Sequence, residues 1–172
     1  MANYYEPTVV EQTIPASAMM PIERLILENT FSFEGTDDAL YFYAEDQIND
    51  YISLDVGEVR TALDANSDPT STAFKRVLDE FAQEIQSEDD IDIDTSDRWW
   101  TEIFQDIIRR SPDFDHISIY SAFTCGKMRP DGFGGMARLI TASSVRAKST
   151  NNLLQDFIEE AVAAGEMADP CS

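Results

Sequence analysis

The residues that could combine a nucleophile with an anion-binding group lie in one glycine-rich loop. Cys125 is followed by Lys127 and Arg129, and Asp131 then precedes a run of glycines. A thiol beside cations can ionise and attack an electrophile, and Lys or Arg can hold an anion. Only three residues separate Cys125 from Arg129, too few for a loop whose backbone wraps a phosphate. We therefore predict an inert, buried thiol in a hairpin loop whose glycines adopt positive φ. Lys127, Arg129 and Asp131 are a second-tier binding candidate, with ion pairing inside the fold as the favoured use of the cations.

The single histidine gives this thiol no evident base. His116 begins a β-prone run and shares no motif with a Ser or Cys nucleophile. Residues 131–135 also lack the spacing and the Lys-Ser/Thr pair of a phosphate-binding loop. We therefore expect no catalytic residue. A small enzyme that uses Cys125, Arg129 and the glycine loop is the alternative hypothesis.

A calcium-loop pattern begins at Asp90 and does not continue. Asp90, Asp92 and Asp94 alternate as in such a loop. Thr95, however, occupies the position that demands glycine, and Thr101 occupies the position of the bidentate Glu. We expect neither a metal ion nor a cofactor.

The densest group of chemically active side chains is a block of carboxylates between residues 79 and 97, where there are nine acids and no base. Same-face carboxylates stand about 6.6 Å apart on a strand and about 5–6 Å apart on a helix, whereas each DNA strand carries one charge per about 3.4 Å. Two such rows approach the charge density of one DNA strand. A solvated helix face with a polar strand edge is the simpler alternative. We predict a partner-binding surface that copies nucleic acid and consists of Asp79, Glu80, Glu84, Glu88, Asp89, Asp90, Asp92, Asp94 and Asp97.

The excess of acid is large and uneven along the chain. The 172 residues carry 33 acids and 12 bases, a net charge of −21, whereas solubility needs a net charge of only about 2–8. Residues 1–115 hold 27 acids and 7 bases, while residues 116–172 hold 6 acids and 5 bases. Adaptation to salt would spread acid over every exposed face, so the uneven distribution favours a use for the charge.

The elements that must position these residues are typical of an α+β protein. Residues 1–21 contain three prolines and are expected to form an arm laid across the domain or across a partner subunit. Between residues 23 and 33 apolar and polar side chains alternate, which suggests a strand, although Pro21 could equally open a short helix. A turn at residues 35–38 and a strand at residues 40–43 follow.

Periodicity predicts the elements of the acidic region. Asp55 and Glu58 have the spacing of a helix cap. Apolar residues at helical spacing from Phe74 predict one helix that reaches Ile85. Residues 90–94 alternate aspartate and isoleucine, which indicates a strand with isoleucine inward.

The last third of the chain contains a long hairpin between two helices. Ser96 is expected to cap a helix that ends before Pro112, and residues 116–143 have the pattern of the hairpin. Residues 153–161 form a last helix that stops at Gly165. The prediction is an antiparallel sheet with about four helices packed on it, arranged as an arm over residues 1–21 and a single α+β domain over residues 22–172.

Cysteine usage and hydropathy indicate a reducing compartment. Cys125 and Cys171 are the only cysteines, too few for a disulfide scaffold. No base precedes Arg24, so the charged start of a secretory signal is missing. No apolar run approaches the roughly 20 residues that span a bilayer, and an anionic membrane surface would repel the chain. We predict a cytoplasmic protein without membrane contact.

Two segments stand out from the acidic background: FQDIIRRSP at residues 104–112 and CGKMRPDGFGG at residues 125–135. Together they resemble a group of uncharacterised small acidic bacterial proteins associated with plasmids and other mobile elements. Such elements often encode acidic DNA mimics, and by charge and size the chain is similar to antirestriction and anti-CRISPR proteins. The acidic signature of the best-known antirestriction family is missing, and the resemblance brings no catalytic residue.

These features predict a non-enzymatic inhibitor that occupies the nucleic-acid-binding groove of a host defence protein, either a restriction enzyme or a CRISPR effector. The expected partner is a basic nucleic-acid-binding protein or effector complex. Direct binding to DNA or RNA is not expected, because two polyanions repel each other. An acidic, antitoxin-like partner of one basic protein is a further alternative. A homodimer is compatible with the N-terminal arm.

Overall fold

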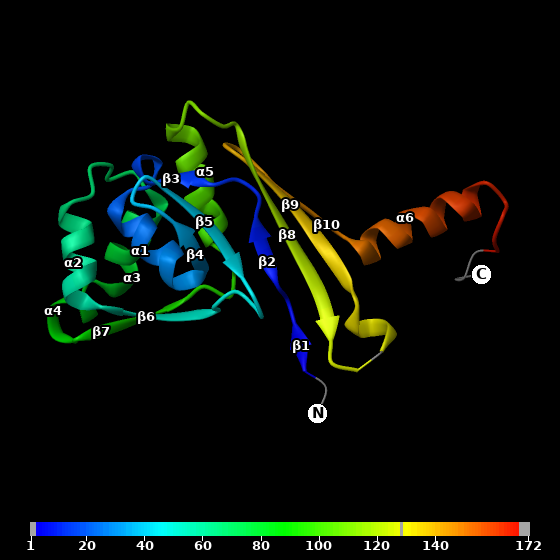
Figure 1. Cartoon of the computed structure of the whole chain (residues 1–172), viewed down its shortest axis with the longest axis horizontal. Coiled ribbons are helices and arrows are strands. Elements are labelled where there is room, and N and C mark those ends of the chain that lie inside the picture. Colours follow the sequence, from blue (N-terminus) through cyan, green and yellow to red (C-terminus); the bar gives the residue numbers. More distant parts are fainter. Residues whose placement is uncertain (1–2, 128, 169–172) are drawn as a thin grey trace.

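Strands from both ends of the chain pair in one antiparallel sheet (Figure 1), in a computed structural model that describes residues 3–127 and 129–168. The strand order is β10-β9-β8-β2-β5-β3, with β1 paired to β8 and β4 paired to β5. A separate two-stranded sheet joins β6 to β7. The strands are β1 Tyr4–Tyr5, β2 Thr8–Val10, β3 Ile14–Pro15, β4 Ser32–Gly35, β5 Ala39–Ala44, β6 Tyr51–Asp55, β7 Asp90–Asp94, β8 His116–Cys125, β9 Gly134–Thr141 and β10 Val145–Ser149.

The described part of the chain also contains six α-helices and two short 3-10 helices. The predicted α+β class with an antiparallel sheet is confirmed, but the number of helices is larger than the expected four because residues 21–30 are helical and the segment 74–85 is divided. No helix in the described ranges is both long and apolar enough to cross a bilayer. The helices are η1 Ala16–Ala18, α1 Pro21–Thr30, α2 Val56–Asp64, α3 Thr72–Phe81, α4 Glu84–Ser87, α5 Trp100–Arg110, η2 Pro130–Gly132 and α6 Thr150–Ala163.

An aromatic cluster forms the centre of the core between α5 and the sheet. Trp100 of α5 is fully buried and meets the ring of Phe31 edge-on at a centroid distance of 5.1 Å. Phe104, one turn further along α5, contacts Trp100 and also Phe42 of β5. Burial alternates along β5, so Phe42 faces the helices while its neighbours face outward. This cluster therefore holds the helical layer against the sheet.

The opposite face of strands β2, β8, β9 and β10, here called the outer face, has no helix from the described chain packed flat on it. Val9 and Tyr120 lie opposite each other across β2 and β8, and Tyr120 lies opposite Ala137 of β9. Residues paired in this way point to the same face of a sheet. Tyr120 is 48 % exposed and Leu139 is 38 % exposed, so large apolar side chains on this face meet solvent.

Residues 3–21 lie within the segment predicted to be an arm across the domain or a partner subunit, and they contribute strands to the central sheet. Residues 8–10 form β2, which pairs with β5 on one side and with β8 on the other. The side chains of Val10 and Ile14 are fully buried. Pro7 lies between β1 and β2 and Pro15 ends β3, where a missing N–H breaks no ladder.

Residues 21–30 form helix α1 rather than the strand that their alternation suggests. Pro21 occupies the first turn, where its missing N–H costs no hydrogen bond. The carboxylate of Glu23 accepts a hydrogen bond from the Met20 N–H at 2.9 Å, which caps the helix. Ile22, Ile26 and Leu27 are buried on one helical face. The helix-start signal of Pro21 and Glu23 therefore predicts this segment better than the two-residue alternation does.

Glu23 is a fully buried carboxylate held by groups from distant parts of the chain. It accepts hydrogen bonds from the hydroxyl of Ser71 at 2.8 Å and from the guanidinium of Arg110, which also pairs with Asp68. Burial raises the pKa of Glu23 above its ordinary value of 4.5, against the opposing effects of the Met20 N–H, Arg110 and Ser71. Glu23 thus links α1 to Ser71 at the start of α3 and to Arg110 of α5. Its shifted pKa also makes the folding stability depend on pH.

The sign of that dependence gives a first prediction. Because the pKa of Glu23 is higher in the folded protein, its contribution to stability is fully present below the unfolded value of 4.5 and is lost as the pH rises through the folded value. The variant Glu23→Gln removes the titration and keeps the shape. Urea denaturation at a series of pH values should show the free energy of unfolding of the wild type falling relative to that of the variant over this range. Glu45→Gln, at an exposed carboxylate, is the control, and a difference that grows with pH would show that Arg110 outweighs burial.

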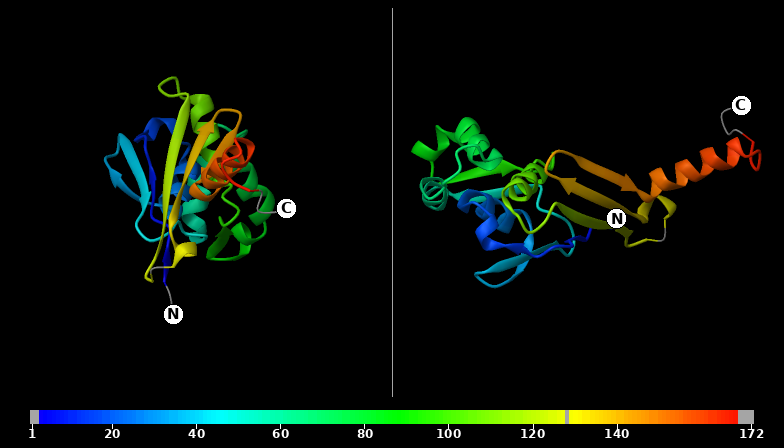
Figure 2. Two further views of the ribbon diagram at one scale, coloured as in Figure 1. Left: turned by 90° about the vertical axis from the view of Figure 1, so that its right-hand side faces the viewer. Right: turned by 90° about the horizontal axis from the view of Figure 1, so that it is seen from above.

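The two helices that flank the long hairpin, α5 and α6, each differ from expectation in one respect. Helix α5 begins after Trp99, not at Ser96, and no side chain caps it. Helix α6 is followed by Gly165 at a φ of +74°, as the sequence predicts, and it is capped by Ser149, which was not predicted. The expectation that this helix packs on the sheet is wrong, because none of its residues is buried and it projects away from the sheet (Figures 1 and 2).

Candidate functional site

The exposed face of the two-stranded sheet β6–β7, here called the acidic ribbon, presents four aspartates. Ile91 and Ile93 of β7 are 2 % exposed, so the alternation turns Asp90, Asp92 and Asp94 outward as predicted. Same-face residues on one strand lie about 6.6–6.8 Å apart. Their cross-strand partners are Asp55, Ser53 and Tyr51, respectively.

Like charges face each other at one end of the acidic ribbon. Asp55, the last residue of β6, lies directly opposite Asp90. Like charges in that position destabilise a strand pair. Asp55 also accepts a hydrogen bond from the Glu58 N–H at 2.9 Å and so caps α2, which confirms the predicted cap. Asp55 therefore both caps α2 and places a negative charge beside Asp90.

Asp94 is held in its ionised form at the other end of the ribbon. Its carboxylate accepts a hydrogen bond from the Ser96 N–H at 2.8 Å. Hydrogen bonds from the side chain and the backbone of Ser96 lower the pKa of Asp94 below its ordinary value of 3.8. Asp94 therefore stays negatively charged at pH values well below neutral.

The remaining predicted acids lie on separate segments, not on one continuous helix. Asp79 and Glu80 belong to α3 and Glu84 begins α4, whereas Glu88, Asp89 and Asp97 lie in the connections before and after β7. The turn between the two helices lets Ile85 be buried, and its carbonyl accepts a hydrogen bond from the guanidinium of Arg60 in α2. The single helix predicted to reach Ile85 is therefore divided.

All nine acids of the predicted surface are exposed, which confirms the expected orientation, while their binding role stays a prediction. Arg76 pairs with Glu80 at 3.0 Å and with Asp97 at 3.3 Å, and its guanidinium lies 4.6 Å from the ring centre of Trp99. Within the described chain the other seven acids make no ion pair with its Lys or Arg residues. Most of this charge is therefore left for solvent or for a partner.

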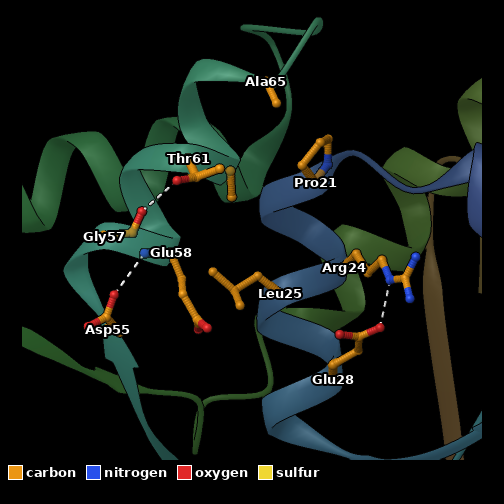
Figure 3. A pocket seen from close by; sticks show the side chains of 10 residues that line it. Pro21, Arg24, Leu25, Glu28, Asp55, Gly57, Glu58, Thr61 and Ala65 are labelled. Atoms are coloured by element: carbon orange, nitrogen blue, oxygen red, sulfur yellow. Dashed lines mark hydrogen bonds and ion pairs between the residues drawn. The ribbon is translucent and has the colours of Figure 1, made fainter.

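Next to the ribbon, a groove of about 650 Å³ lies between α1 and α2 (Figure 3). Leu25 of α1 and Ala62 of α2 give it an apolar lining. Glu58 and Asp55 lie on the α2 side of the groove, and Glu28 pairs with Arg24 on the α1 side at 2.6 Å. Asp55 belongs to both the groove and the ribbon. This arrangement suits an apolar side chain carried by a basic segment.

The sequence prediction missed β6 and this groove. Residues 51–55 alternate exposed and buried side chains, and that two-residue period is visible in the sequence YISLD. The groove left no such signal, because Leu25 and Ala62 come from separate helices and only the packing of α1 on α2 brings them together.

The glycine-rich loop assembles no nucleophile–base pair. Cys125 is buried at one end of β8 and His116 lies at the other end, nine residues away, which is about 30 Å along a strand. Lys127, Arg129 and Asp131 are exposed. Within the described residues no cluster of three or more potential metal ligands occurs, and Cys171 lies outside those residues.

The expectation of positive φ at the loop glycines is wrong. Among the described glycines, only Gly35 and Gly165 have positive φ. Gly132 is instead required for space, because a Cβ there would lie 2.4 Å from the Cβ of Cys125. The loop glycines thus let the backbone pack on the thiol, which fits a buried and inert Cys125.

Fold and surface together define an acidic α+β protein with an exposed carboxylate surface at one end. No family model, no curated protein and no solved structure matches the chain. The resemblance to mobile-element proteins therefore stays a prediction.

Proposed function

We propose that the chain is an acidic inhibitor that mimics DNA and occupies the nucleic-acid-binding groove of a host defence protein, a restriction or CRISPR effector. The observation that supports this most directly is the exposure of the nine acids between residues 79 and 97, of which only Glu80 and Asp97 pair with a base of the described chain. A protein whose Lys and Arg residues release counterions from DNA can bind such a surface in the same way. The proposed compartment is the cytoplasm, which suits the free thiol of Cys125.

The acidic surface also faces little repulsion from a basic partner and much from nucleic acid. With a net charge of −21, the chain is steered toward basic grooves and away from DNA and RNA. We therefore expect no direct binding to nucleic acid. The proposal involves no catalysis, and it is supported by the position of His116, which lies at the opposite end of β8 from Cys125.

The groove between α1 and α2 favours a second candidate, an antitoxin-like protein that neutralises one basic partner. Its apolar lining beside Asp55 and Glu58 would give a specific anchor that a general DNA mimic does not need. The two candidates differ in what competes with the partner. Duplex DNA displaces the partner of a mimic, whereas it leaves a partner anchored in the groove by apolar contact.

Competition measures this difference. The immobilised chain is used to capture proteins from a bacterial lysate, and the captured proteins are then challenged with duplex DNA and with increasing salt. We expect basic nucleic-acid-binding proteins that duplex DNA releases and that dissociate as salt screens the charge. Mobility-shift assays with the chain alone should show no complex with DNA. Retention of the partner in excess DNA would overturn mimicry and favour the antitoxin-like candidate.

A further inference from the structure

Helix α6 presents an apolar stripe that its own chain leaves uncovered. Leu153, Leu154 and Phe157 are 43 %, 57 % and 55 % exposed. With Ile158 and Ala161 they recur at the spacing of one helical face. Exposed apolar patches of this kind mark interaction sites in soluble proteins.

The stripe continues directly into the outer face of the sheet. One groove is lined by Tyr120 of β8, Ala137 of β9 and Leu153 of α6. A second groove shares Tyr120 and Ala137 and extends to Leu139 and Arg146. Helix and sheet face therefore form two sides of one open angle, whose apolar surfaces meet at Leu153.

The two sides of this angle have opposite charge. On β9 and β10 the exposed bases are Arg146 and Lys148, since Arg138 is buried on the inner face beside Ser121, and residues 134–149 contain no acid. Residues 150–163 of α6 contain three acids and no base. Lys148 and Asp156 already pair with each other within the chain. Arg146 on the sheet and Glu160 on the helix make no ion pair in the described part of the chain and are free to meet counterparts elsewhere.

We infer that a second copy of this chain covers these surfaces. In the pair, α6 of each copy lies along the outer face of β8, β9 and β10 of the other copy. The contact between the apolar stripe and the outer face therefore occurs twice, related by a two-fold axis. The lengths agree, since 14 helical residues span about 21 Å and the eight residues of β9 span about 27 Å. Charge favours this occupant, because the three acids of α6 complement Arg146 and Lys148 on the outer face, and a basic protein would be repelled by these two cations. The pairing does not depend on the proposed inhibition.

The test begins with the mass of the full chain in solution. Light scattering after size-exclusion chromatography should give the mass of two chains for the wild type, and one chain of 19.3 kDa for the double variant Leu154→Gln/Phe157→Gln. Both residues are exposed, so circular dichroism should show an unchanged fold. Phe33→Gln, at another exposed aromatic residue outside the surface, is the matched control and should remain dimeric. A monomeric wild type, or a double variant that stays dimeric, would overturn the inference.

Charge exchange separates self-pairing from an effect on folding. Arg146→Glu and Glu160→Arg should each weaken the dimer at least tenfold, because like charges then face each other twice. An equimolar mixture of the two variants restores both opposite-charge contacts and should dimerise as tightly as the wild type. A mixture that stays as weak as the single variants would contradict the reciprocal contact of α6 with β10.

Discussion

Neutralising Glu88, Asp89, Asp90, Asp92 and Asp94 together as amides is expected to weaken binding to the basic partner by about two orders of magnitude. Each exposed charge pair contributes about 0–1 kcal/mol, and about 1.4 kcal/mol is a tenfold change in affinity, so five losses add to a large effect. The amides keep the shape of the surface. Titration calorimetry or surface plasmon resonance at several salt concentrations measures the loss, and the variant should also show a smaller dependence on salt.

A variant with the same change in net charge at another place is the control for this prediction. Glu34, Asp37, Asp38, Glu45 and Asp46 are exposed around β4 and β5, away from the ribbon in the sequence. Their amides raise the net charge by the same five units. If the control variant binds as weakly as the ribbon variant, net charge alone drives association. If the ribbon variant binds as well as the wild type, mimicry by this segment is wrong.

Trp100→Ala is expected to cost about 3–5 kcal/mol of folding free energy, the usual loss for a buried aromatic side chain. Trp100 is fully buried and contacts Phe31 and Phe104 edge-on, so its removal opens a cavity at the point where α5 meets the sheet. Natural domains are stable by only about 5–15 kcal/mol. Urea denaturation followed by circular dichroism should show a large fall in the midpoint.

Two further substitutions show whether that loss comes from the core. Tyr51→Ala removes a ring that is 70 % exposed and should change stability by only about 0.5 kcal/mol. Trp100→Phe keeps part of the packing and should fall between the two alanine variants. Equal losses for Trp100→Ala and Tyr51→Ala would contradict the central role of the aromatic cluster.

Local patterns in the sequence predicted those elements whose periodicity and caps agree. The Asp–Ile alternation of β7, the Asp55 cap of α2 and the β8–β9 hairpin all occur in the structure. Helix α1 was not predicted securely, because the alternation at Leu25 and Leu27 also fits a strand. The ion-pair partner of its buried Glu23 is Arg110, which lies 87 residues away and gives no local signal.

The candidate surface could be predicted in its residues but not in its arrangement. Charge density alone indicated residues 79–97, and burial of Ile91 and Ile93 turned their neighbours outward. The facing strand β6 and its Asp55 were missed, since cross-strand neighbours are set by pairing and not by sequence distance. The exposure of α6 was missed for a related reason: an apolar stripe predicts a helix face to be covered without saying which surface covers it.

Strand β2 sets the order in which a newly made chain can complete its sheet. The hydroxyl groups of Thr8 and Ser121 lie 2.8 Å apart in the finished protein and 113 residues apart in the sequence. At about 5–20 residues per second, a ribosome needs roughly 6–23 s to travel between them. Once β5 has been made, β2 can pair with it, but the other edge of β2 stays open until β8 is made. Open edges of this kind invite pairing with other chains, so slower elongation lengthens the period in which the nascent chain is open to such pairing.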